Sequence, residues 1–394
     1  MTIQRAARIE RLRPSATVGV TTRAMALEAE GRDIIRLSVG EPDFDTPDHI
    51  KRAAIQAIEA GLTKYTALDG TRSLKTAIQR KLERENGLKY GLDQILVSCG
   101  AKQACFNLCL AVLDSGDEAV IPAPYWVSYP EMVRMAEAEP VYVHATAENG
   151  FLMRPEELES AITPATRLLI LNSPSNPTGA VYTRAALEAL GEVLMEHPKI
   201  VILSDEIYEH IQWAVDPYTS FAVACPRLYE RTVTINGVSK AYAMTGWRLG
   251  YAAGPKELIR AMAALQSQST TNASSISQAA AEAALEGDQT SVREMCAEFR
   301  ARHDIVQPLI DRIEGVHCPP SGGAFYLLPD VREVLKRKGI KDDVAFCEAL
   351  LEETGVALVP GSPFGAPGYV RISFAASLGT MREAIARIAA FIES

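Results

Sequence analysis

The chain has 394 residues, of which 47% are hydrophobic and 23% charged, and its net charge at pH 7 is −9. This balance excludes disordered and fibrous proteins, and the length favours a large domain with a smaller companion. The negative charge argues against a nucleic-acid-binding protein, which needs a basic surface, and no apolar run is long enough to span a bilayer.

The N-terminal segment and the cysteines give no sign of export or of a metal site. Several arginines occur in the first 15 residues, but Glu10 and the lack of an apolar stretch argue against a targeting peptide. We interpret this segment as an arm of the folded protein. The seven cysteines are scattered without a CxxC pair, so neither a disulfide framework nor a zinc site is expected. The sequence therefore predicts a cytoplasmic protein without a bound metal.

From about residue 48 to residue 290, short apolar runs alternate with longer amphipathic segments. We predict strands in "QILVSCG", "DEAVIPAP", "RLLILNSP", "KIVILSDE", "RTVTING" and "WRLGYAAG". Helices are predicted in "AKQACFNLCLAVL", "YWVSYPEMVRMAEA" and "RAALEALGEVLMEH". This alternation predicts an α/β fold with a mainly parallel sheet that helices cover on both faces.

The last hundred residues have a different pattern. Short strands are predicted in "GGAFYLLPD", "GVALVPGSPFG" and "YVRISFAAS", before a closing amphipathic helix in "TMREAIARIAAFIE". They indicate a smaller α+β domain that the N-terminal residues complete. The predicted division is 48–290 for the large domain, and 1–47 plus 291–394 for the small domain.

Ligands of parallel sheets bind at the carboxyl ends of the strands, and a lysine lies near one such end. Lys240 follows "RTVTING" among small and apolar residues. An ordinary surface lysine is one interpretation. A desolvated lysine that forms a Schiff base with a carbonyl cofactor is the other. Pyridoxal phosphate, the cofactor of that kind, also needs an anion site, a carboxylate beside its ring nitrogen and a flat partner for its ring.

Candidates for the anion site follow the predicted strand "QILVS". Backbone N–H groups of Gly100, Ala101 and Lys102 at a helix start suit a phosphate. Arg248 and Ser239 can add a charge and a hydroxyl. The alternative for the glycine is a tight turn.

The remaining requirements have candidates at other strand ends. Asp205 suits the pyridine nitrogen, although an acid there can also be a helix N-cap. Tyr208, expected on the same helical face, and Asn176 can hydrogen-bond the cofactor's phenolate oxygen. Trp126 can stack on the ring or simply pack in the core. Arg371 interrupts an apolar strand, and its planar fork suits a substrate carboxylate, with an internal salt bridge as the alternative.

Six segments together resemble the class I aminotransferases, which are fold-type I pyridoxal-phosphate enzymes. They are "SVGEPDFDTP", "KYTALDGTRSLKTAI", "SPSNPTGAVY", "SDEIYEH", "SKAYAMTGWRLGY" and "YVRISFAAS". They occur in the family's order and cover nearly the whole chain. The resemblance implies a seven-stranded sheet between helices, with a smaller α+β domain.

The resemblance also implies a role for each residue that matches a motif. Lys240 would hold pyridoxal phosphate and move the proton, with Asp205 and Tyr208 as its catalytic partners. The implied cofactor-binding residues are Gly100, Ala101, Lys102, Trp126, Asn176, Asp205, Tyr208, Ser239, Lys240 and Arg248, with Tyr65 reaching the phosphate of a neighbouring subunit in a homodimer. Arg371 would bind the α-carboxylate of the substrate, near Gly40, Trp126 and Asn176.

One position departs from the family pattern. Many relatives have a hydroxyl residue three positions before the lysine, where this chain has Gly237. The phosphate site is therefore expected to have one donor fewer, which leaves its membership open.

Three segments, "RPSATVGV", "GAKQA" and "APYWVSYPEM", are similar to the bacterial aspartate aminotransferase branch, some of whose members act on prephenate. That similarity implies that Lys102 and the N-terminal segment read the distal carboxylate of the substrate. Arg13, Ser15 and Thr17 are the candidates in that segment, with Arg13 the candidate for prephenate; a solvated arm residue is the alternative for it.

We therefore expect a ping-pong aminotransferase that acts on L-aspartate and 2-oxoglutarate, and also on prephenate. The alternatives are an aromatic amino acid aminotransferase, a carbon–sulfur lyase of the same fold, and a non-catalytic binder. No nucleic-acid or membrane partner is expected.

Overall fold

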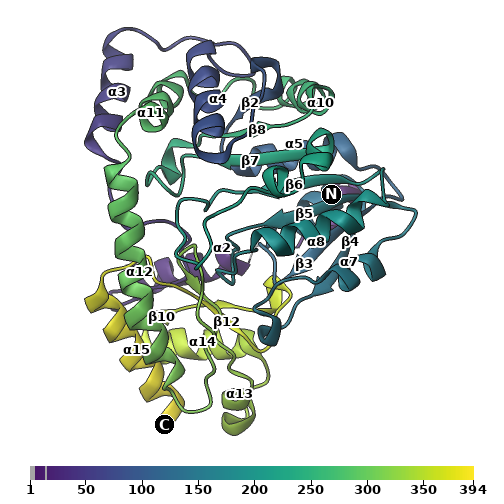
Figure 1. The fold of residues 1–394 in the computed structure, drawn as a ribbon. Coiled ribbons are helices and arrows are strands. Elements are labelled where there is room, and N and C mark those ends of the chain that lie inside the picture. The colour runs from purple at the N-terminus through teal and green to yellow at the C-terminus, as the bar shows by residue number, and fades with distance from the viewer. Residues whose placement is uncertain (1–4, 14–15) are drawn as a thin grey trace.

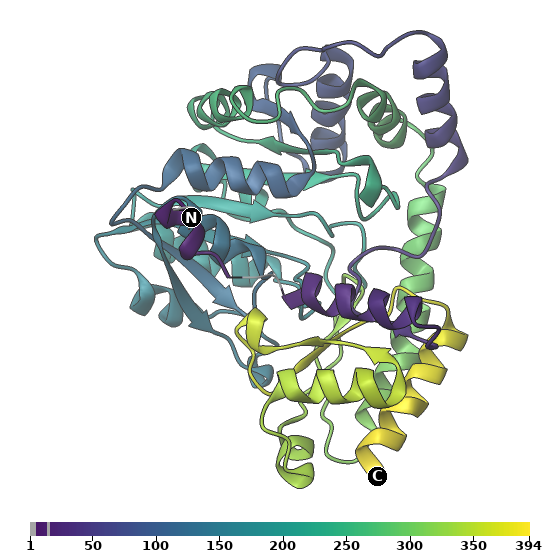
Figure 2. The same cartoon turned by 180° about the vertical axis from the view of Figure 1, so that it is seen from behind.

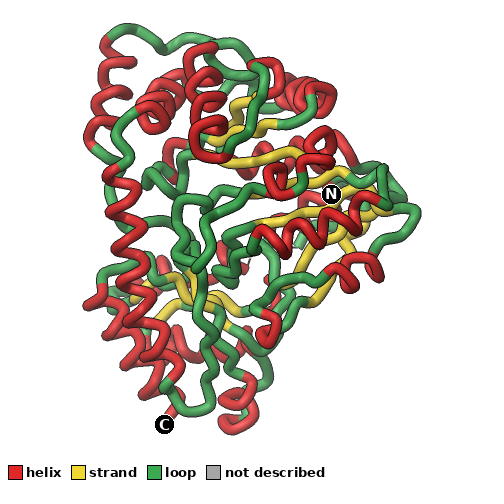
Figure 3. The backbone as a smooth tube through the Cα atoms, in the orientation of Figure 1, coloured by secondary structure: helices red, strands yellow, loops and turns green. Residues whose placement is uncertain are grey.

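The computed structural model describes residues 5–13 and 16–394. Its main element is a seven-stranded sheet in the order β2-β8-β7-β6-β5-β3-β4 (Figures 1 and 3). Only β8 runs antiparallel to its neighbours. The strands are β2 (Ile95–Ser98), β3 (Glu118–Ala123), β4 (Glu139–His144), β5 (Thr166–Asn172), β6 (Val201–Asp205), β7 (Thr232–Gly237) and β8 (Gly250–Ala253).

Side chains of β5 alternate between two hydrophobic clusters, one on each face of the sheet. Leu168 and Ile170 pack in a cluster with α5 (Ala101–Val112), α6 (Ser128–Met135) and α10 (Lys256–Ser267). Leu169 and Leu171 pack on the opposite face. That face is covered by α4 (Arg72–Asn86), α7 (Pro155–Ala161), α8 (Arg184–Met195), α9 (Phe221–Ala224) and α11 (Ser275–Glu286), with α3 (Asp48–Glu59) against α11. Burial on both faces explains why these strands are continuous apolar runs.

The predicted strands and helices of this part are confirmed, and one strand was missed. The edge strand β4 has no counterpart among the predictions. Its residues are largely half-exposed, and it pairs with only one neighbour, β3. An edge strand lacks the uninterrupted apolar run by which the central strands are recognised.

The C-terminal part contains two small sheets. β1 (Ile35–Arg36) pairs in parallel with β10 (Val356–Ala357), and β12 (Val370–Ser373) lies antiparallel between β11 (Val359–Pro360) and β9 (Tyr326–Leu327). Figure 1 shows α12 running from below α3 and α11 to this part, and Figure 2 shows α2 beside this part. The helices outside the large sheet's covering layers are α1 (Ala7–Glu10), α2 (Ala16–Ala29), α12 (Thr290–Asp311), α13 (Arg332–Lys338), α14 (Asp343–Thr354) and α15 (Leu378–Glu393).

We propose the domain division predicted from the sequence, 48–290 and 1–47 with 291–394. It is supported by a hydrophobic cluster in which Ile35 and Leu37 pack with side chains from Phe299 to Ile392. Tyr208 from the loop after β6 belongs to the same cluster, which brings the two parts together at that loop. Within residues 5–13 and 16–394, no helix has both the length and the apolar character needed to cross a membrane.

Candidate active site

A cavity of about 350 Å³ opens at the carboxyl ends of the parallel strands. Most of the predicted site residues line it, although they come from segments that are far apart in the chain. The predicted residues in its lining are Gly40, Ala101, Lys102, Trp126, Asn176, Asp205, Tyr208, Ser239, Lys240, Arg248 and Arg371. Val18, Tyr129, Asn172, Thr245 and Tyr326 also line it.

An anion site is formed where α5 begins. Gly100 is the N-cap of α5 with φ +89°, a conformation that side chains with a Cβ rarely adopt. A Cβ on Gly100 would lie 2.5 Å from Nη2 of Arg248, so the guanidinium packs directly against the helix start. Arg248 donates through Nη1 to the carbonyl of Thr245 at 2.8 Å. The Gly100 N–H, which was predicted as a phosphate donor, already donates to the Ser98 carbonyl at 2.8 Å. The N–H groups of Ala101 and Lys102 at the helix start and the guanidinium of Arg248 are the groups that favour a phosphate.

Gly237, where a relative would have a hydroxyl, is closed to any side chain. A Cβ there would lie 2.9 Å from Cα of Gly250 and 2.9 Å from the carbonyl oxygen of Leu249. Gly250 in turn packs against the backbone at Ala101, where its own Cβ would lie 2.2 Å from the nitrogen. β7, β8 and the start of α5 therefore approach each other so closely that no hydroxyl-bearing side chain fits at Gly237. The hydroxyl of the cavity at this end comes from Ser239.

Asp205 ends β6 and is 4% exposed. One carboxylate oxygen accepts from the Tyr129 hydroxyl at 2.6 Å, and the other accepts from the Ile207 backbone N–H at 3.2 Å. Burial raises the pKa of Asp205, while these two donors oppose the rise. A buried carboxylate of this kind favours a cation in front of it, such as a protonated ring nitrogen. Tyr129 was not predicted, because an aromatic residue in an apolar helix reads as core.

The turn after Asp205 carries Tyr208 into the cavity. The prediction that both residues lie on one helical face is wrong. Glu209 N–H donates to the Glu206 carbonyl and Ile211 N–H to the Tyr208 carbonyl, which are bonds of successive turns. The Tyr208 hydroxyl lies 2.9 Å from the hydroxyl of Tyr326, a second residue that the sequence did not single out.

Arg371 is buried in β12 with 2% exposure, and no carboxylate of the described residues lies within 4.0 Å of it. The internal salt bridge considered as its alternative is absent from this part of the chain. Nη1 donates to Oδ1 of Asn176 at 3.0 Å and Nη2 to the Ser38 carbonyl at 2.6 Å. Its Nε has no hydrogen-bond partner among the described atoms. A buried guanidinium left this incomplete requires an anion from outside.

The amine of Lys240 lines the same cavity as Arg248 and Arg371. It donates to the carbonyl of Gly40, and its Nζ is 5.8 Å from the ring centroid of Tyr208. Burial first, and then the charges of Arg371 and Arg248, lower the pKa of Lys240 to about 8. This lysine is therefore far closer to a neutral, nucleophilic amine than a surface lysine.

Lys102 and Trp126 form the outer wall of the cavity. Nζ of Lys102 lies 4.8 Å from the centroid of the Trp126 ring, and that ring packs edge-on against Tyr129 at 5.2 Å. Burial and the charge of Arg248 lower the pKa of Lys102. The wall thus combines a flat aromatic surface with a cation.

Among the predicted residues that the structure describes, Tyr65 and Arg13 do not line the cavity, and Gly100 adjoins it through Arg248. Tyr65 is 91% exposed on the surface. Arg13 is exposed, and its backbone N–H donates to the Glu131 carboxylate at 2.9 Å. Ser15 lies outside the described residues, and the side chain of Thr17, in the first turn of α2, is not described either. Val18, one residue on, does line the cavity.

The comparisons with known proteins agree with this geometry. A family model described as "Aminotransferase class I and II" matches residues 32–388. The aspartate/prephenate aminotransferase of Nitrosomonas europaea is 52% identical over 391 residues, 98% of each chain. That of Cereibacter sphaeroides is 54% identical over 388 residues, 97% of each chain.

Solved structures are equally similar. The crystal structure of the aspartate aminotransferase from Rhizobium meliloti has a TM-score of 0.96 and 49% identity, and covers 100% of this chain and 99% of that one. The aspartate aminotransferase from Thermus thermophilus with maleate has a TM-score of 0.93 and 44% identity, and covers 99% of this chain and 100% of that one. With a matching family model and half of all residues shared over full length, the chain belongs to the class I and II aminotransferases.

Proposed function

We propose that this enzyme moves the amino group of L-aspartate to 2-oxoglutarate in two half-reactions and also accepts prephenate. The observation that carries the proposal is Arg371, a buried guanidinium to which the described residues offer no carboxylate, inside a cavity that also holds a lysine whose pKa is lowered to about 8. A second cation, Lys102, lines the same cavity, as a dicarboxylate requires. The relatives named as aspartate/prephenate aminotransferases support the choice of substrates.

The residues of the cavity fit pyridoxal phosphate. The start of α5 with Arg248 and Ser239 suits the phosphate, and Asp205 suits the ring nitrogen. Trp126 offers a flat surface for the ring, and Lys240 offers the amine that would hold the cofactor. When bound, pyridoxal phosphate supplies an electron sink for the charge left by removal of a proton from the substrate's α-carbon.

The chain's own residues would then bind the substrate and move the proton. Arg371 would hold the α-carboxylate through its planar fork, with the amide of Asn176 and the backbone of Gly40 beside it. Lys240, once its amine is free, would take the α-proton as a general base, for which a pKa near the working pH is best. The Tyr208 hydroxyl would donate toward the cofactor's phenolate oxygen.

The distal carboxylate of aspartate would be bound at the wall formed by Lys102 and Trp126. Lys102 over Trp126 is the cation of that wall, and the beginning of α2 reaches the cavity at Val18. Arg13 stays our candidate for prephenate, since it lies in the segment just before α2.

We propose a homodimer in the cytoplasm, with Tyr65 reaching the neighbouring subunit's cofactor phosphate. Around Tyr65, large apolar side chains are exposed on one segment: Ile55 at 53%, Ile58 at 53% and Leu62 at 55%. Such a set supports an interface with a second copy. The cysteines are all free thiols, as in a reducing compartment.

The rate at which the cofactor-free enzyme takes up pyridoxal phosphate should depend on the pKa of Lys240. Only the neutral amine attacks a carbonyl, so we expect the rate of covalent uptake to rise with pH to a midpoint near pH 8. Because folding lowers this pKa from 10.5, the folded protein binds fewer protons, and its stability rises between about pH 8 and 10.5. Stopped-flow absorbance at fixed pyridoxal phosphate measures the rate. A midpoint near 10.5 would contradict a buried amine.

The substrate proposal is tested by adding L-aspartate to dialysed enzyme without an acceptor. The reaction should stop after one equivalent of oxaloacetate per subunit has formed. Addition of 2-oxoglutarate or prephenate should restart it. Lys102→Ala should lower kcat/KM for aspartate by about 10- to 100-fold, the loss of one charged hydrogen bond. It should affect alanine, which has no distal carboxylate, far less. Continued release of pyruvate and ammonia from a cysteine derivative would instead identify a carbon–sulfur lyase.

A further inference from the structure

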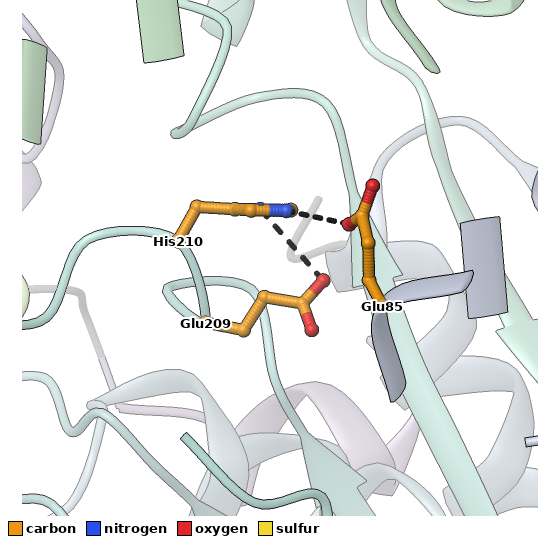
Figure 4. Close-up of side chains that lie close together, drawn as sticks. All are labelled: Glu85, Glu209 and His210. Atoms are coloured by element: carbon orange, nitrogen blue, oxygen red, sulfur yellow. Dashed lines mark hydrogen bonds and ion pairs between the residues drawn. The ribbon is translucent and has the colours of Figure 1, made fainter. Parts of the chain in front are cut away.

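A group of charged side chains lies on the far side of the Tyr208 turn from the cavity. Lys81 of α4 has a side chain that is 1% exposed, and its amine contacts a carboxylate oxygen of Glu209, which is 4% exposed. Figure 4 shows His210 directed toward both Glu85 and Glu209, at 2.8 Å and 3.7 Å. The proposed reaction uses none of these groups.

Three donors surround Glu209, and they come from two separate elements. Besides Lys81, Asn86 at the end of α4 donates to Oε2 at 2.7 Å, and Asn236 of β7 donates to Oε1 at 2.6 Å. Burial alone would raise the pKa of Glu209, but Lys81, His210 and the hydrogen bond from Asn86 hold it below its usual range. Glu209 is thus a fully hydrogen-bonded carboxylate that joins α4 to β7.

A metal ion does not fit this group. Glu85, Glu209 and His210 offer ligand atoms within 4.8 Å of one another. However, the ammonium of Lys81 already contacts Glu209, and Nη2 of Arg84 donates to Glu85 at 2.6 Å. Two cations therefore balance the charges of the two carboxylates, and a divalent ion would add uncompensated charge beside the buried Glu209.

The connections of Glu209 lead to the two sides of the candidate active site. Glu209 directly follows Tyr208 in a turn that belongs to no helix or strand. Asn236 lies four residues before Lys240, and its Oδ1 accepts from the Gly237 N–H at 2.7 Å. The hydrogen bond from Asn236 to Glu209 therefore ties the Tyr208 turn to the strand that leads to Lys240. It adds to the backbone bond from the Glu206 N–H to the Ile235 carbonyl.

Stability alone does not explain such an arrangement, because a buried ion pair contributes little more to folding than apolar side chains of the same size. We propose that Glu209 is a positioning residue that sets the place of the Tyr208 hydroxyl relative to Lys240. This rests on the proposed function, in which the hydroxyl donates to the phenolate oxygen of the cofactor that Lys240 holds. A displaced hydroxyl would stabilise the phenolate less and so raise the pH at which the bound cofactor loses its proton.

The test compares two double variants of the enzyme loaded with pyridoxal phosphate. Both replace Lys81 with methionine, so that no buried charge is left alone. Glu209→Met removes the acceptor for Asn236, whereas Glu209→Gln keeps one. We expect the Glu209→Met double variant to raise the pH midpoint of the cofactor's absorption by about one unit and to lower kcat about 10- to 100-fold. The Glu209→Gln double variant should have a pH midpoint and a kcat close to those of the parent enzyme.

Two further variants complete the experiment. Asn236→Ala removes the same bond but keeps the Lys81–Glu209 pair, so it should shift the midpoint in the same direction even if the double variants do not fold. Lys75→Met removes another ion pair of α4, in which the lysine side chain is 11% exposed and its partner Asp69 is 37% exposed. Lys75 forms no ion pair or hydrogen bond with Glu209, so this variant should leave the midpoint unchanged.

The outcomes separate this inference from the substrate proposal. A parental midpoint and kcat in both Asn236→Ala and the Glu209→Met variant, with only a lower melting temperature, would overturn the positioning role. A shifted midpoint in an enzyme whose parent does not transaminate aspartate would overturn the substrate and keep the positioning role.

Discussion

Replacing Lys240 with alanine is expected to lower the rate of the aspartate half-reaction by at least about 10,000-fold. The side chain would carry two tasks, holding the cofactor and moving the α-proton, and removal of a positioned general base alone costs about 100- to 10,000-fold. Single-turnover absorbance of the bound cofactor with saturating aspartate measures the rate. The variant should still bind pyridoxal phosphate, because Asp205 and Arg248 remain in place.

Two controls make the result specific to the amine. Borohydride should fix the cofactor irreversibly to the parent enzyme and not to Lys240→Ala. Lys240→Arg keeps a positive charge but cannot supply a neutral amine, so it should be as slow as the alanine variant. A half-reaction in Lys240→Ala within 100-fold of the parent would contradict the assignment of Lys240 as the base.

The residues whose place in the fold the sequence predicted most directly are those at strand ends. Gly100, Asp205 and Lys240 each follow a buried run, and the carboxyl ends of parallel strands meet at one edge of a sheet. The apolar run therefore locates the residue, and the residue type limits its chemistry. Arg371 was found differently, as a cation in an apolar strand, and the structure removes the competing salt bridge among the described residues.

The parts that the sequence did not predict depend on contacts between distant positions. Tyr129 bonds Asp205 across 76 positions, and Lys81 bonds Glu209 across 128. In the sequence, the tyrosine reads as core and the lysine as a solvated helix residue, because neither pattern tells which group will face it. The closed space at Gly237 is likewise a property of β8 packing against β7, not of the segment itself.

Arg302 and Arg371 are both buried, but only Arg302 has carboxylate partners among the described residues. Arg302 is 7% exposed and pairs with Asp43 at 2.7 Å and Glu298 at 2.9 Å. Arg371 is buried more deeply, and the described residues offer it no carboxylate. Removing Arg302 leaves two acids without their cation, whereas removing Arg371 leaves no charge behind.

We therefore expect Arg371→Leu to lower kcat/KM for aspartate between roughly 30-fold and several thousand-fold, the cost of leaving a bound carboxylate without its buried partner. The melting temperature of the free enzyme should change little, because the desolvation cost of a guanidinium without a carboxylate is removed while its hydrogen bonds to Asn176 and to the Ser38 carbonyl are lost. Arg371→Lys, which keeps the charge and loses the fork, should fall between the parent and the leucine variant.

Arg302→Leu should do the reverse, lowering the free energy of unfolding by about 1–3 kcal/mol with a smaller loss of kcat/KM. Chemical denaturation and steady-state kinetics on the same preparations measure both quantities. If Arg371→Leu lost stability as Arg302→Leu does and kept its affinity for aspartate, Arg371 would be a structural residue. We expect Arg371→Leu to lose affinity for aspartate and to keep its stability. A site prepared for a substrate carboxylate must carry a guanidinium without a carboxylate until that substrate binds.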